Sequence, residues 1–200
     1  MNSIKQIEVI YNNRLVGRLA LTREGLCAFE YSAEWLSSGF SISPFELPLR
    51  SGVFIAKPRP FEGGFGVFDD CLPDGWGLLI LDRYLQQKGI NPRTLTLLDR
   101  LALVGSTGRG ALEFRPDNSV VTRQDFADFE KLALEAEKIL ASDDYMGEGI
   151  EEFQDRGGSP GGARPKIFVR YNDKEWLVKF RAKRDSQSIG VDEYRYSLLA

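Results

Sequence analysis

The first thirty residues restrict the fold more than any other part of the chain, because apolar and polar residues alternate there. The apolar runs cover residues 4–10, 15–21 and 26–31, and Asn12-Asn13 supplies a tight turn between the first two. Strand side chains point to opposite faces with a period of two, and short turns join antiparallel neighbours. The sequence therefore predicts an N-terminal β-meander.

Helical spacing of apolar residues replaces this alternation further along the chain. It covers residues 76–87, and residues 91–105 predict a second short helix before GALEFRP returns to a strand. A third helix is expected after residue 125, with Thr122 or Asp125 as its cap. Strands followed by short helices, without regular βα repeats, predict an α+β fold.

Composition excludes several classes of site. The chain has 200 residues, 28% of them charged, a net charge of −3 and no histidine, so the usual zinc sites and Ser/His or Cys/His catalytic pairs are ruled out. Cys27 and Cys71 lie far apart among apolar neighbours and are expected to be buried thiols. The sequence has neither a membrane-spanning apolar run nor the layout of a signal peptide, so we expect a cytoplasmic protein.

Glycines and cations gather in GGSPGGARPK, residues 157–166, just before two strand-like runs joined by Asn172-Asp173. Eight Lys or Arg and only two Asp or Glu lie within residues 164–184. Glycines let the backbone approach a phosphate, and a fixed lysine such as Lys179 neutralises its charge. A glycine loop, a hairpin and a lysine follow one another in this order in the ATP-binding lobe of kinases. Neither the GxGxxG nor the Walker pattern fits, so a flexible linker and a solvated basic face remain alternatives.

Aromatic and acidic residues flank the turn PDGWG. Phe68 and Trp76 are expected to lie in the core rather than on a partner surface. Asp69, Asp70 and Asp74 are interpreted as a solvated helix N-terminus, where the helix dipole favours carboxylates, rather than as a metal site.

Four segments, taken together, resemble the HipA family of bacterial toxin kinases: LPDGWG, LLDRLALVGSTGRGALEF, GGSPGGARPK and VKF. The resemblance covers nearly the whole chain. It implies a toxin–antitoxin serine/threonine protein kinase that uses ATP and Mg²⁺ and phosphorylates a translation component such as an aminoacyl-tRNA synthetase. A HipB-like DNA-binding antitoxin is the implied partner, and neither direct nucleic-acid binding nor a membrane is expected.

The resemblance also implies a domain organisation and roles for single residues. It divides the chain into an N-terminal subdomain at 1–115, a helical connection at 116–150 and part of a kinase-like N-lobe at 151–200. Lys179 matches the lysine that contacts the nucleotide phosphates, and Ser159 matches a regulatory autophosphorylation site. Glu193 is the natural partner of Lys179 on the following helix, although spacing alone does not choose between Glu193 and Asp192. The residues that match the ATP-binding loop are Gly161, Gly162, Ala163, Arg164, Pro165 and Lys166.

The aspartates that a kinase needs for catalysis and for magnesium are expected well beyond Glu193, which only seven residues follow. No catalytic or metal-ligating residue is therefore assigned, and the 200-residue chain is expected to be inactive alone, as a fragment or as the product of a split or decayed gene. The alternative function is a stand-alone binding or inhibitory module of a split HipA-type system. The loop and Lys179 favour the kinase, because a docking module has no use for them.

Overall fold

The computed structural model describes residues 3–119, 127–157, 162–182 and 184–199. Its contacts divide the chain into two compact units. The first, here called the sheet unit, comprises Met1–Pro73 and Asn91–Val120, and the second, the hairpin unit, comprises Asp74–Ile90 and Val121–Ala200. Each unit is made of two separate stretches of the chain. The division into 1–115, 116–150 and 151–200 that the sequence suggests stays a prediction.

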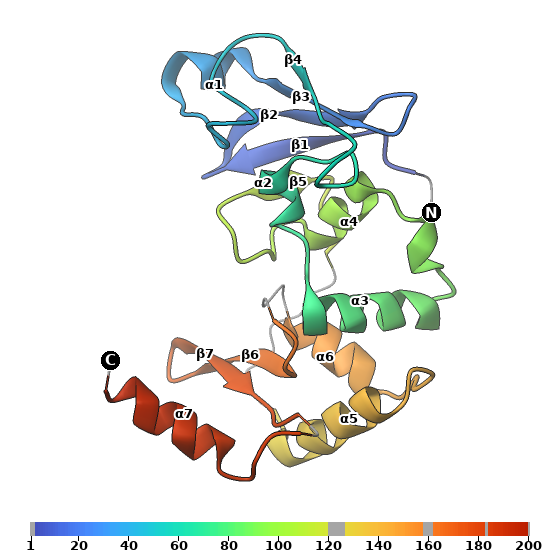
Figure 1. Cartoon of the computed structure of the whole chain (residues 1–200), viewed down its shortest axis with the longest axis vertical. Helices are drawn as coiled ribbons and strands as arrows, with labels where there is room; N and C mark the ends of the chain where they lie inside the picture. Colours follow the sequence, from blue (N-terminus) through green and yellow to red (C-terminus); the bar gives the residue numbers. More distant parts are fainter. Residues whose placement is uncertain (1–2, 120–126, 158–161, 183, 200) are drawn as a thin grey trace. The chain divides into compact units, whose positions relative to one another are not determined.

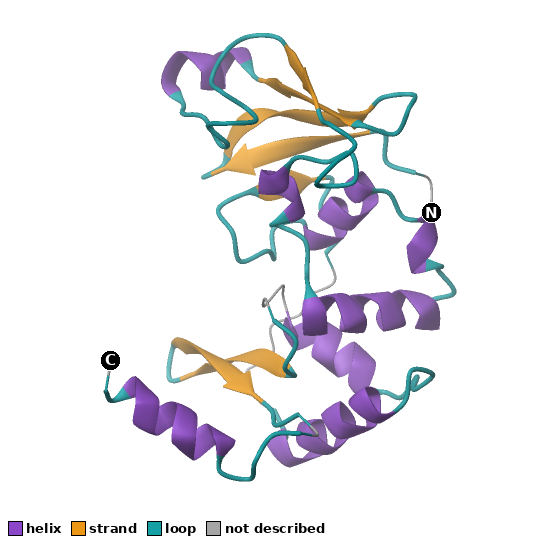
Figure 2. Ribbon diagram, viewed as in Figure 1, coloured by secondary structure: helices purple, strands orange, loops and turns teal. Residues whose placement is uncertain are grey.

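A five-stranded antiparallel sheet forms the sheet unit, in the order β4-β3-β2-β1-β5 (Figures 1 and 2). Asn12 and Asn13 both have positive φ, at 47° and 60°, as the two-residue turn between β1 and β2 requires. The predicted β-meander and the α+β class are confirmed. The strands are β1 (Gln6–Tyr11), β2 (Arg14–Leu21), β3 (Cys27–Tyr31), β4 (Val53–Ile55) and β5 (Glu113–Arg115).

Short helices complete the sheet unit: α1 (Ala33–Ser38), α2 (Gly66–Asp69), the 3-10 helix η1 (Pro92–Thr94) and α4 (Leu97–Val104). Helix α4 begins with a capping box, in which the Thr96 hydroxyl accepts from the Asp99 amide and the Asp99 carboxylate accepts from the Thr96 amide. Phe68 of α2 is fully buried, and its ring lies 5.4 Å from that of Phe29 and 6.4 Å from that of Phe114. These aromatic contacts join α2 to strands β3 and β5.

The described residues of the hairpin unit form four helices and a two-stranded sheet (Figure 1): α3 (Gly75–Gln87), α5 (Phe129–Ala141), α6 (Gly149–Gly157), β6 (Lys166–Tyr171), β7 (Lys174–Lys179) and α7 (Ile189–Ser197). Phe153 of α6 is at the centre of its core. The Phe153 ring meets Trp76 and Phe180 edge-on, with centroids 5.0 and 5.8 Å away. The prediction that Phe68 and Trp76 are core residues is confirmed.

Side chains of α3 hold the connection between α5 and α6. The buried Arg83 guanidinium donates to the carbonyl oxygens of Ile139 at 2.7 Å and Ser142 at 2.9 Å, and Gln87 Nε2 donates to that of Met146 at 2.8 Å. Such bonds satisfy carbonyl groups left open at the end of a helix. Helix α3 is therefore bound to the hairpin unit by polar as well as apolar contacts.

Two features of the hairpin unit differ from the sequence interpretation. Asp128 caps α5, its side chain accepting from the Lys131 amide at 3.0 Å, whereas the predicted caps Thr122 and Asp125 lie outside the described residues. Helix α6 was not predicted, because its segment is acidic and contains glycine. Among the described helices, none is both long and apolar enough to cross a membrane.

Candidate functional site

The β6–β7 hairpin brings two lysines to the same end of a small sheet. Asn172 and Asp173, at φ 50° and 57°, form its tight turn, and the register places Lys166 directly opposite Lys179. Side chains that face each other across an antiparallel pair have Cβ atoms roughly 5 Å apart. The last residue of the glycine-rich segment therefore lies beside the predicted phosphate-binding lysine.

Lys166 is unusual for a lysine because only 6% of it is exposed. Burial lowers its pKa, the Asp74 carboxylate raises the pKa, and the charges of Lys179 and Arg164 lower it further. A buried ammonium close to other cations is stabilised by an anion, which offsets both the desolvation and the repulsion. This end of the hairpin is thus electrostatically suited to a negatively charged ligand.

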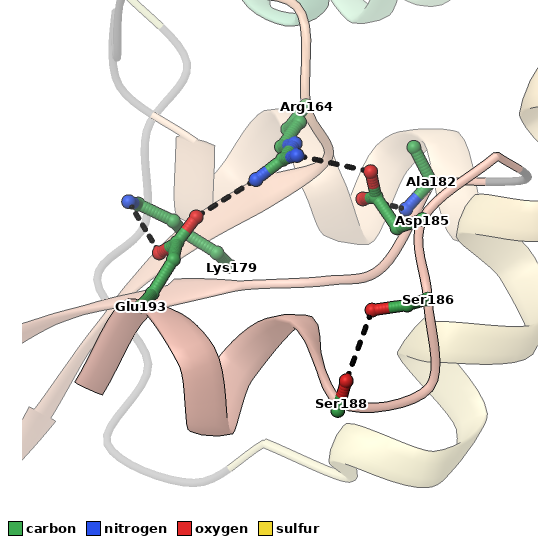
Figure 3. A network of polar contacts seen from close by, with 7 residues as sticks. All are labelled: Arg164, Lys179, Ala182, Asp185, Ser186, Ser188 and Glu193. Carbon is green, nitrogen blue, oxygen red and sulfur yellow. Dashed lines mark hydrogen bonds and ion pairs between the residues drawn. The ribbon is translucent and has the colours of Figure 1, made fainter. Parts of the chain in front are cut away.

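Lys179 and Glu193 form an ion pair between β7 and α7, with Nζ and Oε2 2.9 Å apart (Figure 3). The hydrogen bond and charge of Lys179 lower the pKa of Glu193. Asp192 instead accepts from the Ser188 hydroxyl at 2.8 Å and lies 3.9 Å from Arg195. Of the two adjacent carboxylates, Glu193 is therefore the partner of Lys179 in the structure.

Arg164 shares the same glutamate. Its Nη1 is 2.7 Å from Glu193 Oε1 and its Nη2 is 2.9 Å from Asp185 Oδ1 (Figure 3). Asp185 is itself held by the Ala182 amide, which donates to Oδ2 at 2.8 Å. One guanidinium thus bridges α7 and the segment after β7, and Glu193 pairs with two cations. These two ion pairs hold the Arg164 side chain in one orientation, although 41% of it is exposed.

After Gly157, the last residue of α6, the described part of the glycine-rich segment runs from Gly162 to Lys166. Gly162 has φ +92°, in the region that favours glycine, and a Cβ there would meet Lys166 Nζ at 3.1 Å. The Pro165 carbonyl accepts from the Phe180 amide at 2.8 Å, which continues the pairing of the hairpin by one bond. Residues 162–166 are therefore attached to the hairpin rather than being a free linker.

The structure brings together Arg164, Lys166, Lys179 and Glu193 from the predicted set, with Gly162, Ala163 and Pro165 forming the backbone beside them. Gly161 and Ser159 lie outside the described residues. Sequence reasoning missed Asp185, which no motif distinguishes from other acidic residues. It also missed the contact of Asp74 with the glycine segment, since a helix N-terminus explained that residue sufficiently. The nucleotide-binding roles of all these residues stay a prediction.

Within the described ranges, no group of three or more Asp, Glu or Cys side chains could hold a metal ion. The cations at the end of the hairpin, by contrast, have the charge and donor chemistry that a polyphosphate requires. Arg164, Lys166 and Lys179 supply the donors that phosphate groups would need, and the described residues offer no ligand cluster for Mg²⁺.

Comparison with known proteins identifies the family. A search of the curated proteins finds no match, but the family model of the HipA N-terminal domain matches residues 7–115. This match covers more than half of the 200 residues. It includes the five strands of the sheet unit, except for Gln6 at the start of β1, and α3 of the hairpin unit. The chain accordingly belongs to the HipA family.

Proposed function

We propose that the chain is the N-terminal portion of a HipA-like toxin–antitoxin serine/threonine protein kinase, that Gly162–Lys166 and Lys179 bind the phosphates of ATP, and that Glu193 positions Lys179. The observation that carries this proposal is the hairpin register, which pairs Lys166 with Lys179 next to the glycine segment. Family membership supports the kinase assignment. A stand-alone inhibitory module is the second candidate, and it has no need of a buried lysine or of the Lys179–Glu193 pair.

Each residue has a separate task in this proposal. ATP, when bound, supplies the phosphoryl group, and the chain's own residues orient and neutralise its phosphates. The ion pair with Glu193 holds the Lys179 ammonium in one position. Lys179 therefore loses less side-chain entropy when the phosphates bind. The phosphates add negative charge near Lys166, whose charged form is disfavoured by burial and by the neighbouring cations. Amide groups near Gly162 approach the phosphates closely because glycine has no side chain.

The remaining parts of the proposal rest on the family. The substrate is a translation component such as an aminoacyl-tRNA synthetase, and the partner is a HipB-like DNA-binding antitoxin. Ser159 is a regulatory phosphorylation site: phosphate there adds a charge of about −1.5 to −2 and competes with the nucleotide for Arg164 and Lys166. In a full-length kinase, Ser159→Asp is expected to lower ATP affinity and Ser159→Ala to leave it nearly intact. Equal affinities of Ser159→Asp and the wild type would contradict this role.

The test is a titration of the ¹⁵N-labelled chain with ATP and Mg²⁺, followed by NMR. We expect the amide signals of Gly162 and Ala163 to shift, with a dissociation constant on the order of millimolar, because few groups contact the nucleotide. Lys179→Met should abolish the shifts. Lys174→Met is the matched control, since Lys174 is exposed at the opposite end of the same strand. Loss of the shifts in both variants, or shifts only in the sheet unit, would contradict the proposed site.

A further inference from the structure

The first turn of α3 contacts the glycine-rich segment through hydrogen bonds that an ordinary helix start does not make. The Gly162 amide donates to Asp74 Oδ1 at 2.8 Å, and the Trp76 amide donates to the Gly162 carbonyl at 3.1 Å. Asp74 occupies the N-cap position but makes no side-chain bond to its own helix. An N-cap aspartate normally accepts from the second or third amide of the helix. Here the Gly162 amide is the donor to the Asp74 carboxylate, and the Gly162 carbonyl is the acceptor for the Trp76 amide. Two hydrogen bonds therefore hold the backbone of Gly162.

Gly75 allows this close approach. Its φ is +46°, and a Cβ at this position would lie 2.8 Å from the carbonyl carbon and oxygen of Gly162 and 3.0 Å from the Cα of Ala163. Real Cβ atoms do not come this near to backbone atoms, so any other residue forces the two segments apart. Glycine is thus required at position 75 both by its positive φ and by the close approach of Gly162, 87 residues further along the chain.

Asp74 also acts on the charge beside the loop. Its carboxylate favours the protonated form of Lys166, against the desolvation that the buried ammonium suffers. Without Asp74, Lys166 would keep the unfavourable burial and the repulsion from Lys179 and Arg164. The same carboxylate therefore holds the backbone of the segment and helps to keep its lysine charged.

We propose that Asp74 and Gly75 are positioning residues for the nucleotide loop, which hold Gly162–Lys166 in the conformation that receives the phosphates of ATP. This inference rests on the proposed function. Asp74 and Gly75 lie inside the range that matches the HipA N-terminal domain, so in this proposal that domain contributes to the nucleotide site. The contacts themselves lie within the hairpin unit.

Hydrogen exchange of the ¹⁵N-labelled chain tests the anchoring without nucleotide. Asp74→Ala removes the acceptor, and the Gly162 amide should exchange about tenfold faster or more, because hydrogen bonds to charged groups are among the stronger ones. Asp74→Asn keeps an acceptor oxygen and should restore most of the protection. Gly75→Ala should also speed the exchange. Gly89→Ala is its matched control: Gly89 lies at the other end of α3, has φ +74° and has nothing within 4 Å of its Cβ position.

A titration of the same variants with ATP and Mg²⁺ tests the positioning. Asp74→Ala and Gly75→Ala should weaken the shifts at Ala163 at least threefold, and Gly89→Ala should retain them. Asp74→Asn keeps the hydrogen bond but not the charge, so it should weaken the shifts less than Asp74→Ala. Rescue by the asparagine distinguishes positioning from a general loss of folding, which the dispersion of the core signals reports independently. Unchanged Gly162 exchange in Asp74→Ala would overturn the anchoring. Faster exchange with unchanged ATP shifts would overturn the positioning role. If ATP causes no shifts in the wild type, the proposed function is overturned, and the exchange of Gly162 still decides the anchoring.

Discussion

Replacing Arg83 with methionine tests how α3 stabilises the hairpin unit. Methionine retains an unbranched apolar stem, so the packing of the side chain changes little, while the guanidinium that donates to the carbonyls of Ile139 and Ser142 is lost. The Arg83 side chain is only 5% exposed, so the Ile139 carbonyl loses its partner in a buried position, and the Ser142 carbonyl loses its partner in a partly buried one. The third contact, with Asp143 at 3.9 Å, involves a fully exposed carboxylate and contributes little.

The expected cost follows from the two hydrogen bonds. Each bond to a charged group contributes about 1.5–3 kcal/mol. Burial lowers the pKa of Arg83, which indicates that the charged group is itself penalised, so the lower end of that range applies. The sum is about 3 kcal/mol, which corresponds to roughly a hundredfold change in the opening equilibrium of the unit.

Hydrogen–deuterium exchange with mass spectrometry measures this change in peptides from α5 and α6. Arg83→Met should raise their exchange rates roughly a hundredfold and leave peptides of the sheet unit unaffected. Arg170→Met is the matched control, because Arg170 is exposed and pairs only locally with Asp173 across the hairpin turn. Equal effects of the two substitutions would refute the reasoning, since overall charge rather than the two carbonyl contacts would then explain the loss.

Two further predictions concern titratable groups. Because Lys179 lowers the pKa of Glu193, their ion pair is complete above the ordinary pKa of 4.5 and is lost as the pH falls through the lowered value. An NMR titration of the Glu193 carboxyl should therefore show a midpoint below 4.5 that rises in Lys179→Met, and an unchanged midpoint would contradict the pairing. Burial raises the pKa of both Cys27 and Cys71 to about 11, so about a thousandth of each thiol is ionised at pH 8 and labelling by a disulfide reagent should be slow until the chain is unfolded. Rapid labelling of both native thiols would contradict it.

The parts of the fold that were predicted depend on local signals. The turns at Asn12-Asn13 and Asn172-Asp173 were predictable because asparagine and aspartate tolerate positive φ, and the apolar periods on either side are short and regular. Helix α3 shows its apolar period over three turns. In contrast, α1 has six residues and α6 carries one apolar pair, Ile150 and Phe153, so neither segment has a pattern that stands out from its polar neighbours.

The candidate site was likewise predicted only where local sequence signals were enough. Residue types and order were enough to select the glycine segment, Lys179 and Glu193, because a phosphate needs close backbone and fixed cations. The sequence could not choose between Asp192 and Glu193, since adjacent residues differ by about 100° around a helix and only the orientation of α7 decides which one meets Lys179.

The sequence by itself determined the strand pattern, the tight turns, the strongest helices and the family, because each of these follows from neighbouring residues or from a continuous motif. Only the tertiary structure decided which distant groups meet. Arg164 pairs with Asp185 and Glu193, and Gly162 bonds to Asp74, 88 residues away. No local periodicity encodes these contacts, because they depend on how distant segments meet. Helix α3 and the β6–β7 hairpin share the core around Phe153 and Trp76, while the ion pairs of Glu193 attach α7 to the hairpin.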